Sequence, residues 1–425
     1  MRTNRYIVVA MTLLGALGFQ CSATAQSGYQ ISLTLSGNQN GKVEMALQTT
    51  DKMIIIDSLP NVIDGTYHFT GNQPLTPGQY AFLQNGRRLF HFLISFEEMV
   101  NLQFSALVEN GQTSQLSVLN DPENEAYIKL QRFIQDVNRK SNPSEADFLS
   151  VDRYTDSISL LFPNSILSII ARNISTPPLP QYMALHDKRV LNTSLLPLRL
   201  QSFFTNVVSP QPDKIIPQID SILNYSTDPL VKDWCGTFLL SYFLSSNIMG
   251  MEKVAIHIAK KYIDGEIKNN DQDFLHDLEA FVSFNENSLI GLPAPELLLP
   301  DADGQLISLR NLDANYTILL FYDENCPICL EELPEIDQVV QQYKSHNIKV
   351  YAVYTQDRYE AWRTYVLTLN PEWTFVWDPQ FSSGFHKLYN VTGTPTVYLL
   401  DKDKIIIGRE MDALVLQEML SYYLN

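Results

Sequence analysis

The chain has 425 residues, which is too long for one ordinary domain, so we expect two or three domains. Its 30 Lys and Arg against 47 Asp and Glu give a formal net charge of −17. This charge argues against nucleic acid or an anionic membrane surface as a partner. The 4 cysteines are too few for the disulfide framework of a small secreted protein.

The first 25 residues have the pattern of a secretory signal peptide. An apolar stretch over residues 6–19 follows two arginines, and Ala23-Thr24-Ala25 supplies a cleavage site before Gln26. The apolar stretch is too short to span a bilayer. We therefore predict a signal peptide over 1–25 and a periplasmic or cell-envelope protein.

Cys21 offers a second way to end this leader, as the acylated residue of a lipoprotein. A lipoprotein signal requires a small residue before the cysteine, and Gln20 is not small. Lipoprotein anchoring through Cys21 is therefore the less favoured alternative.

Residues 26–120 carry the alternation of apolar and polar residues that is typical of half-buried strands. Asn-Gly pairs at 40–41, 85–86 and 110–111 are strong signals for tight hairpin turns. The segment predicts a small all-β domain of the sandwich kind. No catalytic cluster is evident in it.

Residues 121–285 predict an α-helical domain, because apolar residues recur there every three or four positions. Proline-rich breaks at 177–180 and 210–212 divide it into separate helices. Cys235 falls on an apolar helix face, which predicts a buried, inert thiol rather than a reactive one.

Residues 286–425 predict an α/β domain. Apolar strands are expected at 317–322, 348–354, 373–377, 396–400 and 405–407, with helices after the first two strands and over 413–423. Parallel strands with helical crossovers, followed by a hairpin and a final helix, are the order of a thioredoxin fold.

Cys326-Pro327-Ile328-Cys329 is the most informative motif of the chain. It stands between an apolar strand and a segment with helical apolar spacing. A helix N-terminus stabilises a thiolate through its dipole and its free N–H groups. Cys326 is thus placed to attack a disulfide, and Cys329 to resolve the mixed disulfide that results.

The C-terminal motifs together resemble one known family. They are Gly291-Leu-Pro-Ala-Pro295, Asp303-Gly304, the run from Cys326 to Pro334, and Gly393-Thr394-Pro395-Thr396. Over roughly residues 289–425 the chain resembles the TlpA/ResA-like thiol-disulfide oxidoreductases of the thioredoxin superfamily. The middle and N-terminal regions resemble uncharacterised domains of exported Bacteroidota proteins, which carry no known chemistry.

The resemblance implies roles for several residues. Cys326 would be the attacking thiolate and Cys329 the resolving thiol, while Glu332 would tune the thiol pKa values or relay a proton. Thr394 and Pro395 would form a cis-proline loop that, with Pro327 and Ile328, contacts the partner peptide. No metal or organic cofactor is implied, since the dithiol carries the electrons.

The chain departs from the family pattern beside the cysteines. Asn325 replaces the usual tryptophan, and Leu320 replaces the buried acid of thioredoxin itself. The carboxylates of Asp323 and Glu324 should disfavour a thiolate at Cys326, which makes the pair more reducing. We therefore expect a reductant rather than a strong oxidant.

The partners expected are envelope proteins with disulfides or thiols, together with a membrane-embedded electron donor. Four alternatives stay open: a non-catalytic binding or scaffold protein, a permanent structural disulfide, a thiol peroxidase and half of a zinc site. Peroxidase is disfavoured because Asp323 and Leu319 stand where peroxiredoxins have Thr or Ser and Pro. Zinc is disfavoured because it needs four ligands. Glu332 could also be an ordinary solvated helix residue.

Overall fold

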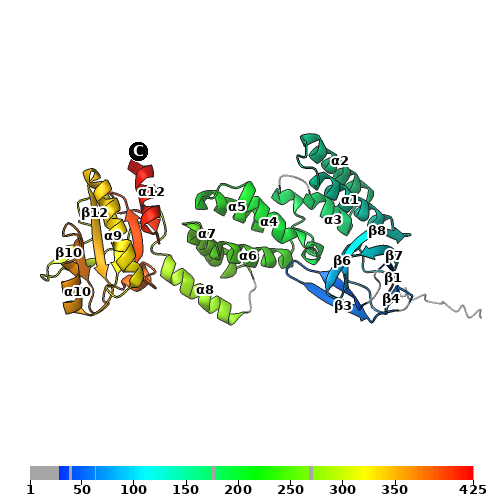
Figure 1. Cartoon of the computed structure of the whole chain (residues 1–425), viewed down its shortest axis with the longest axis horizontal. Coiled ribbons are helices and arrows are strands. Elements are labelled where there is room, and N and C mark those ends of the chain that lie inside the picture. The colour runs from blue at the N-terminus through cyan, green and yellow to red at the C-terminus, as the bar shows by residue number, and fades with distance from the viewer. Residues whose placement is uncertain (1–27, 38–40, 63, 175–177, 268–270, 425) are drawn as a thin grey trace, which may run out of the picture. The chain divides into compact units, whose positions relative to one another are not determined.

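The computed structural model describes residues 28–424, apart from 38–40, 63, 175–177 and 268–270 (Figure 1). The signal peptide predicted over 1–25 and Cys21 lie outside the described residues. Within that part of the chain, no helix combines the length and apolar character needed to cross a membrane. The chain divides into two compact units, 1–168 and 169–425. The domain boundaries expected near 120 and 285 stay predictions.

The first unit contains a sandwich of two four-stranded sheets, with strand orders β4-β1-β7-β8 and β3-β2-β5-β6. Their inward-facing side chains form one core in which Phe69, Phe82, Phe92 and Phe104 are buried. The strands are β1 Tyr29–Gly37, β2 Val43–Gln48, β3 Met53–Leu59, β4 Thr66–Gly71, β5 Gly78–Gln84, β6 Arg87–Ile94, β7 Val100–Glu109 and β8 Gln112–Leu119.

Two of the three Asn-Gly pairs make the predicted hairpins. Asn85-Gly86 joins β5 to β6 and Asn110-Gly111 joins β7 to β8, with positive φ at all four residues. The hairpin predicted at 40–41 is wrong, because β1 and β2 belong to different sheets. β1 instead pairs in parallel with β7, and a local turn signal holds no information about so distant a partner.

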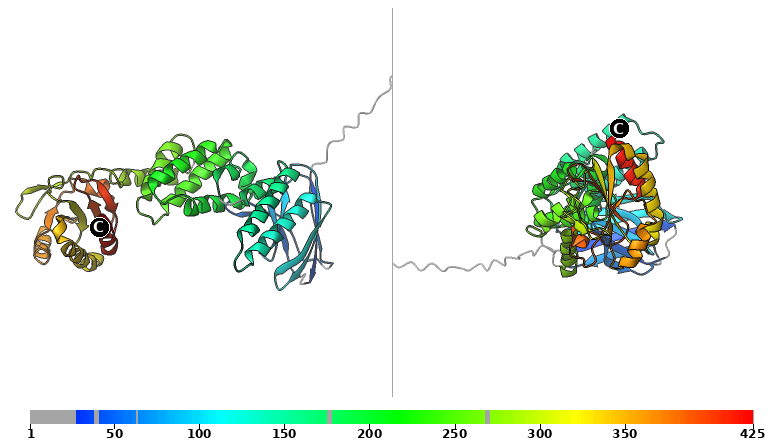
Figure 2. Two further views of the ribbon diagram at one scale, coloured as in Figure 1. Left: turned by 90° about the horizontal axis from the view of Figure 1, so that it is seen from above. Right: turned by 90° about the vertical axis from the view of Figure 1, so that its left-hand side faces the viewer.

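Helix α1 (Pro122–Asn138) begins at Asp121, whose carboxylate accepts from the Asn124 N–H, and it packs against β6 and β8 (Figure 2). The Asn124 amide bonds to both backbone groups of Leu93, at 2.7 and 2.9 Å. Helix α2 (Glu145–Leu161) begins with a capping box and packs on α1. These two helices therefore form one compact unit with the sandwich.

The second unit starts within α3 (Ile166–Ile174) and continues as further helices. Helix α6 lies at the centre of this helical part and contacts α5, α7 and the short helices η2 and η3. The helices are η1 Pro180–Tyr182, η2 Lys188–Asn192, α4 Leu195–Asn206, α5 Pro212–Tyr225, α6 Pro229–Leu244, α7 Met251–Ile258, the π-helical η3 Ala259–Ile263 and α8 Gln272–Asn285.

The C-terminal part is built on a five-stranded sheet of order β13-β12-β11-β14-β15. β11, β12 and β13 are parallel, and β14 and β15 are antiparallel to their neighbours. Its elements, with a preceding hairpin of β9 and β10, are β9 Leu298–Pro300, β10 Leu306–Ser308, β11 Tyr316–Tyr322, α9 Pro327–Gln342, η4 Lys344–His346, β12 Ile348–Tyr354, α10 Tyr359–Val366, β13 Thr374–Trp377, α11 Phe385–Leu388, β14 Thr396–Leu400, β15 Ile406–Arg409 and α12 Ala413–Leu424.

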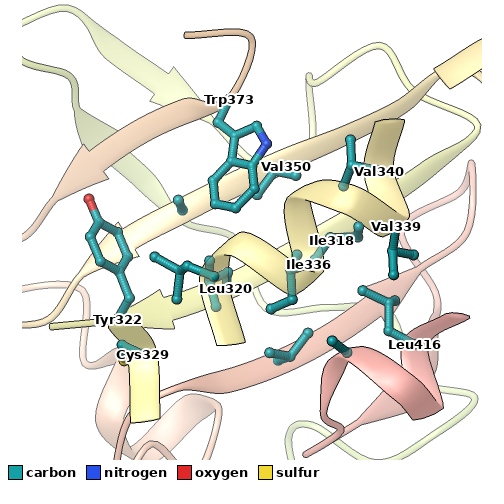
Figure 3. Packing of buried hydrophobic residues seen from close by; sticks show 14 of the residues in the cluster. Ile318, Leu320, Tyr322, Cys329, Ile336, Val339, Val340, Val350, Trp373 and Leu416 are labelled. Atoms are coloured by element: carbon teal, nitrogen blue, oxygen red, sulfur yellow. The ribbon is translucent and has the colours of Figure 1, made fainter. Parts of the chain in front are cut away.

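Helices cover both faces of this sheet. On one face Ile318 and Leu320 of β11 pack against Ile336 of α9 and Leu416 of α12 (Figure 3). On the other face Phe321 stacks on Phe385 of α11 at a ring distance of 5.4 Å. The expected fold class is confirmed: a β region, a helical region and an α/β domain with the thioredoxin arrangement.

Candidate active site at the start of helix α9

The packing of α9 places Cys326 at the junction of strand and helix. β11 ends at Tyr322, and Cys326 is the N-cap residue of α9, with Pro327 as the first helical residue. Proline is suited to that position because its fixed φ matches a helix and it has no N–H to satisfy. The Cys329 N–H points back at the Cys326 sulfur, 3.4 Å away. The sulfur thus occupies the place where a capping oxygen would accept from the helix.

A second segment closes over the same sulfur. The Thr394–Pro395 peptide bond is cis, and the Cys326 thiol donates to the Thr394 carbonyl at 3.0 Å. This loop enters β14, which pairs directly with β11. The sheet therefore brings together Cys326 and Thr394, which lie 68 positions apart in the sequence.

The two cysteines of the motif have different surroundings. Cys326 is partly exposed, whereas Cys329 is fully buried in the core beneath α9, and both are free thiols. Burial opposes ionisation of Cys326, but the Thr394 side chain and the backbone N–H groups of Cys329 and Ile328 outweigh it and lower the pKa of Cys326. Burial raises the pKa of Cys329 to about 12. Only Cys326 is accessible and biased toward the thiolate.

The residues between the cysteines are exposed. The side chain of Ile328 is 58% exposed, and Pro327 beside it is exposed as well. A partner chain that reaches Cys326 would contact both of them. Their predicted role in binding the partner stays a prediction.

Glu332 is one helical turn after Cys329, and its carboxylate has a structural partner. It accepts from the backbone N–H of Ala413, at 3.0 Å, where α12 begins. A carboxylate at a helix N-terminus satisfies a free N–H group and interacts favourably with the helix dipole. Glu332 therefore ties α9 to α12, and its coupling to the thiols stays a prediction.

The two residues that depart from the pattern of the resembled family, Leu320 and Asn325, have different surroundings. Leu320 is fully buried among the apolar residues of the core, whereas Asn325 is exposed beside Cys326. Asp323 and Glu324 both form ion pairs with Arg358, at 3.2 and 3.3 Å. The effect of both acids on the thiolate stays a prediction, and this cation partly neutralises their charge.

Arg358 was missed in the sequence. It stands just before α10, with no spacing relation to the cysteines, and only the pairing of β12 with β11 brings it near them. The only signal in the sequence was a cation shortly after β12, the strand that pairs with β11 beside the cysteines. It is too common a feature to predict a site.

Cys235 takes no part in this arrangement. It is buried within α6, as predicted, and burial raises its pKa to about 12. Among the described residues, no cluster of three or more His, Cys, Asp or Glu could hold a metal ion.

Comparison with known proteins supports a thioredoxin-like C-terminal domain. Residues 290–409 match the AhpC/TSA family. The thiol-disulfide oxidoreductase ResA of Bacillus cereus is 25% identical over 147 residues, which cover 35% of this chain and 83% of the ResA chain. The C-terminal domain is therefore similar to thiol-disulfide oxidoreductases, and the family match includes no residue before 290.

The chain is also similar to parts of solved structures. A domain of a possible thiol-disulfide isomerase from Cytophaga hutchinsonii is 30% identical, with 33% of this chain and 96% of that chain covered and a TM-score of 0.31. A thioredoxin-like protein from Bacteroides caccae is 18% identical, with 67% of this chain and 96% of that chain covered and a TM-score of 0.42.

Proposed function

We propose that this chain is an exported thiol-disulfide oxidoreductase that exchanges disulfides with proteins of the cell envelope through Cys326 and Cys329. One observation carries the proposal. A partly exposed thiol with a lowered pKa caps a helix, and a buried thiol with a raised pKa lies three residues further on. This asymmetry supports attack by Cys326 and resolution by Cys329.

The exchange proceeds in two steps. The Cys326 thiolate attacks one sulfur of the partner disulfide, a mixed disulfide forms, and the other partner sulfur leaves as a thiolate that takes up a proton. Cys329 then loses its proton and attacks the Cys326 sulfur, which expels the second partner sulfur as a thiolate that is protonated in turn. The partner disulfide gains two electrons and two protons, and the Cys326–Cys329 dithiol becomes a disulfide.

The direction we propose is reduction of the partner. A thiolate that is strongly stabilised in the reduced form makes a pair oxidising. Here the carboxylates of Asp323 and Glu324 stand just before Cys326 and, because Arg358 only partly neutralises them, limit the stabilisation of its thiolate. The oxidised pair would be returned to the dithiol by a membrane-embedded electron donor, with no metal or organic cofactor in the chain.

Four residues would hold the partner peptide beside the thiolate. The backbone of Thr394 and Pro395 would pair with an extended peptide, since the Thr394 carbonyl already lies 3.0 Å from the Cys326 sulfur. Pro327 and Ile328 would give it an apolar contact on the opposite side. The predicted signal peptide over 1–25 supports export to the envelope.

Mixing the fully reduced protein with oxidised insulin tests this proposal. We expect about one insulin disulfide reduced per protein, and Cys326→Ser should abolish the reaction. A pair that resists dithiothreitol in the folded protein would contradict the proposal and favour a non-catalytic scaffold. Faster reaction with hydrogen peroxide than with insulin would instead favour a thiol peroxidase.

A further inference from the structure

The loop that leads to Cys326 contains two carboxylates, three and two residues before the nucleophile. Asp323, Glu324 and Asn325 connect the end of β11 to the N-cap of α9. Asp323 and Glu324 therefore bring negative charge near the sulfur, and such charge disfavours its thiolate. Either the site tolerates this repulsion or another group offsets it.

One guanidinium contacts all three loop residues. Arg358 forms ion pairs with Asp323 at 3.2 Å and with Glu324 at 3.3 Å. When the Asn325 amide oxygen faces it, that oxygen accepts from Nη1 at 2.5 Å and from Nη2 at 3.0 Å. A planar fork of donors is suited to such convergent acceptors, whereas an ammonium group is not.

We propose that Arg358 is a positioning residue for Cys326, which fixes the 323–325 loop and offsets the charge of Asp323 and Glu324 beside the thiolate. This inference rests on the proposed function, because it concerns the same nucleophile. It assigns a role to a residue that lies 32 positions after Cys326 in the sequence and that neither the motif nor the family resemblance indicates.

The two carboxylates are largely shielded from water, although Arg358 itself is exposed. The side chains of Glu324 and Asp323 are only 9% and 18% exposed, while that of Arg358 is 44% exposed. Pairs shielded from water are screened less by salt than exposed pairs. Within the described part of the chain, no ion pair joins either acid to another Lys, Arg or His.

The loop geometry depends on the same residues. The Asp323 carboxylate accepts from the Asn325 N–H at 2.9 Å, and the Asp323 carbonyl accepts from the Cys326 N–H at 3.3 Å. Arg358, which holds the Asp323 side chain, therefore also holds the turn that presents the Cys326 sulfur. The same residue thus affects both the negative charge near the sulfur and the position of the sulfur.

The remaining groups around the sulfur do not replace this cation. Cys329 and Tyr365 also interact electrostatically with Cys326, and burial followed by the charge of Cys329 raises the pKa of Tyr365. Both groups therefore stay neutral at physiological pH. From the side of the cis-proline loop, Thr394 presents a carbonyl. The Thr394 side chain and the N–H groups of Cys329 and Ile328 lower the pKa of Cys326, but none of them carries a positive charge.

The test is the pH dependence of iodoacetamide labelling at Cys326, read by mass spectrometry of the full-length protein. Arg358→Gln should move the midpoint to higher pH and slow labelling at pH 6.5 by roughly three- to tenfold, with little change once the thiol is fully ionised. Arg358→Lys should recover part of the loss because it keeps the charge.

Two further variants separate charge from damage to the fold. Lys344→Gln breaks an exposed ion pair with Glu372 in the same domain and should leave the titration unchanged. Adding Asp323→Asn and Glu324→Gln to Arg358→Gln should bring the midpoint back toward that of the unmodified protein. A triple variant that titrates like Arg358→Gln alone would refute the charge offset.

The outcomes also distinguish this inference from the proposed function. An Arg358→Gln protein that labels like the unmodified protein at every pH would overturn the inference, while insulin reduction could still succeed. A shifted titration in a protein that never reduces insulin would support the positioning role and refute the exchange activity.

Discussion

Cys235 inside α6 and Cys326 at the start of α9 have surroundings that give their thiols opposite properties. Cys235 lies inside α6 among apolar side chains, fully buried, with its pKa raised to about 12. Cys326 stands at the first turn of α9, partly exposed, with its pKa lowered. The position along the helix and the access to water decide which thiol is able to react.

The largest effect should come from removing the resolving thiol. Cys329→Ser leaves Cys326 able to attack but removes the group that releases the partner, so a mixed disulfide should accumulate in cells that make the variant. Non-reducing electrophoresis followed by mass spectrometry would detect it. The Cys326→Ser/Cys329→Ser double variant is the control, and Cys235 should not replace the missing nucleophile.

The contrast between Cys326 and Cys235 also predicts a large difference in labelling. At pH 7 the reduced folded protein should react with iodoacetamide at Cys326 at least about a hundredfold faster than at Cys235. The Cys326 rate should rise with pH and reach its midpoint below 9, the ordinary value for a thiol. Comparable labelling of both residues in the folded state would remove the distinction drawn here.

Replacing Cys235 should affect stability and not exchange. Cys235→Ala removes a buried sulfur and leaves a small cavity, so the free energy of unfolding should fall by about 1–2 kcal/mol. Urea denaturation measures this change. Insulin reduction by the variant should equal that of the unmodified protein, and a loss of reduction without unfolding would assign Cys235 a redox role.

The smallest effect is expected at Glu332. Glu332→Gln keeps an acceptor for the Ala413 N–H but loses the charge at the start of α12, which should cost about 0.5–1 kcal/mol of stability. The Cys326 titration should stay unchanged if this role is purely structural. A shifted midpoint would support the role in tuning the thiols that the family resemblance implies.

Local signals in the sequence predicted the C-terminal domain well. The strand expected at 348–354 is β12 to the residue, and the cysteine motif begins α9 as expected. Apolar runs and helix-start signals act over a few residues, so they are visible without the fold. The β9–β10 hairpin and the one-turn α11 were not predicted, because such short elements carry little periodicity.

Features that depend on distant pairing could not be predicted. The parallel pairing of β1 with β7 sets the sandwich topology, and no local pattern encodes it. At the site, the contacts of Glu332 with Ala413 and of Arg358 with Asp323 join residues 81 and 35 positions apart. The sequence identified the nucleophile, whereas the groups that support it required the structure.

The reduction potential of the Cys326–Cys329 pair tests the central claim most directly. The protein would be equilibrated in a series of dithiothreitol and glutathione redox buffers, and the two thiols quantified by alkylation. The account predicts one reversible two-electron transition at a reducing potential, near the value of about −270 mV for thioredoxin. A pair that stays oxidised in every buffer would contradict the account and leave a scaffold.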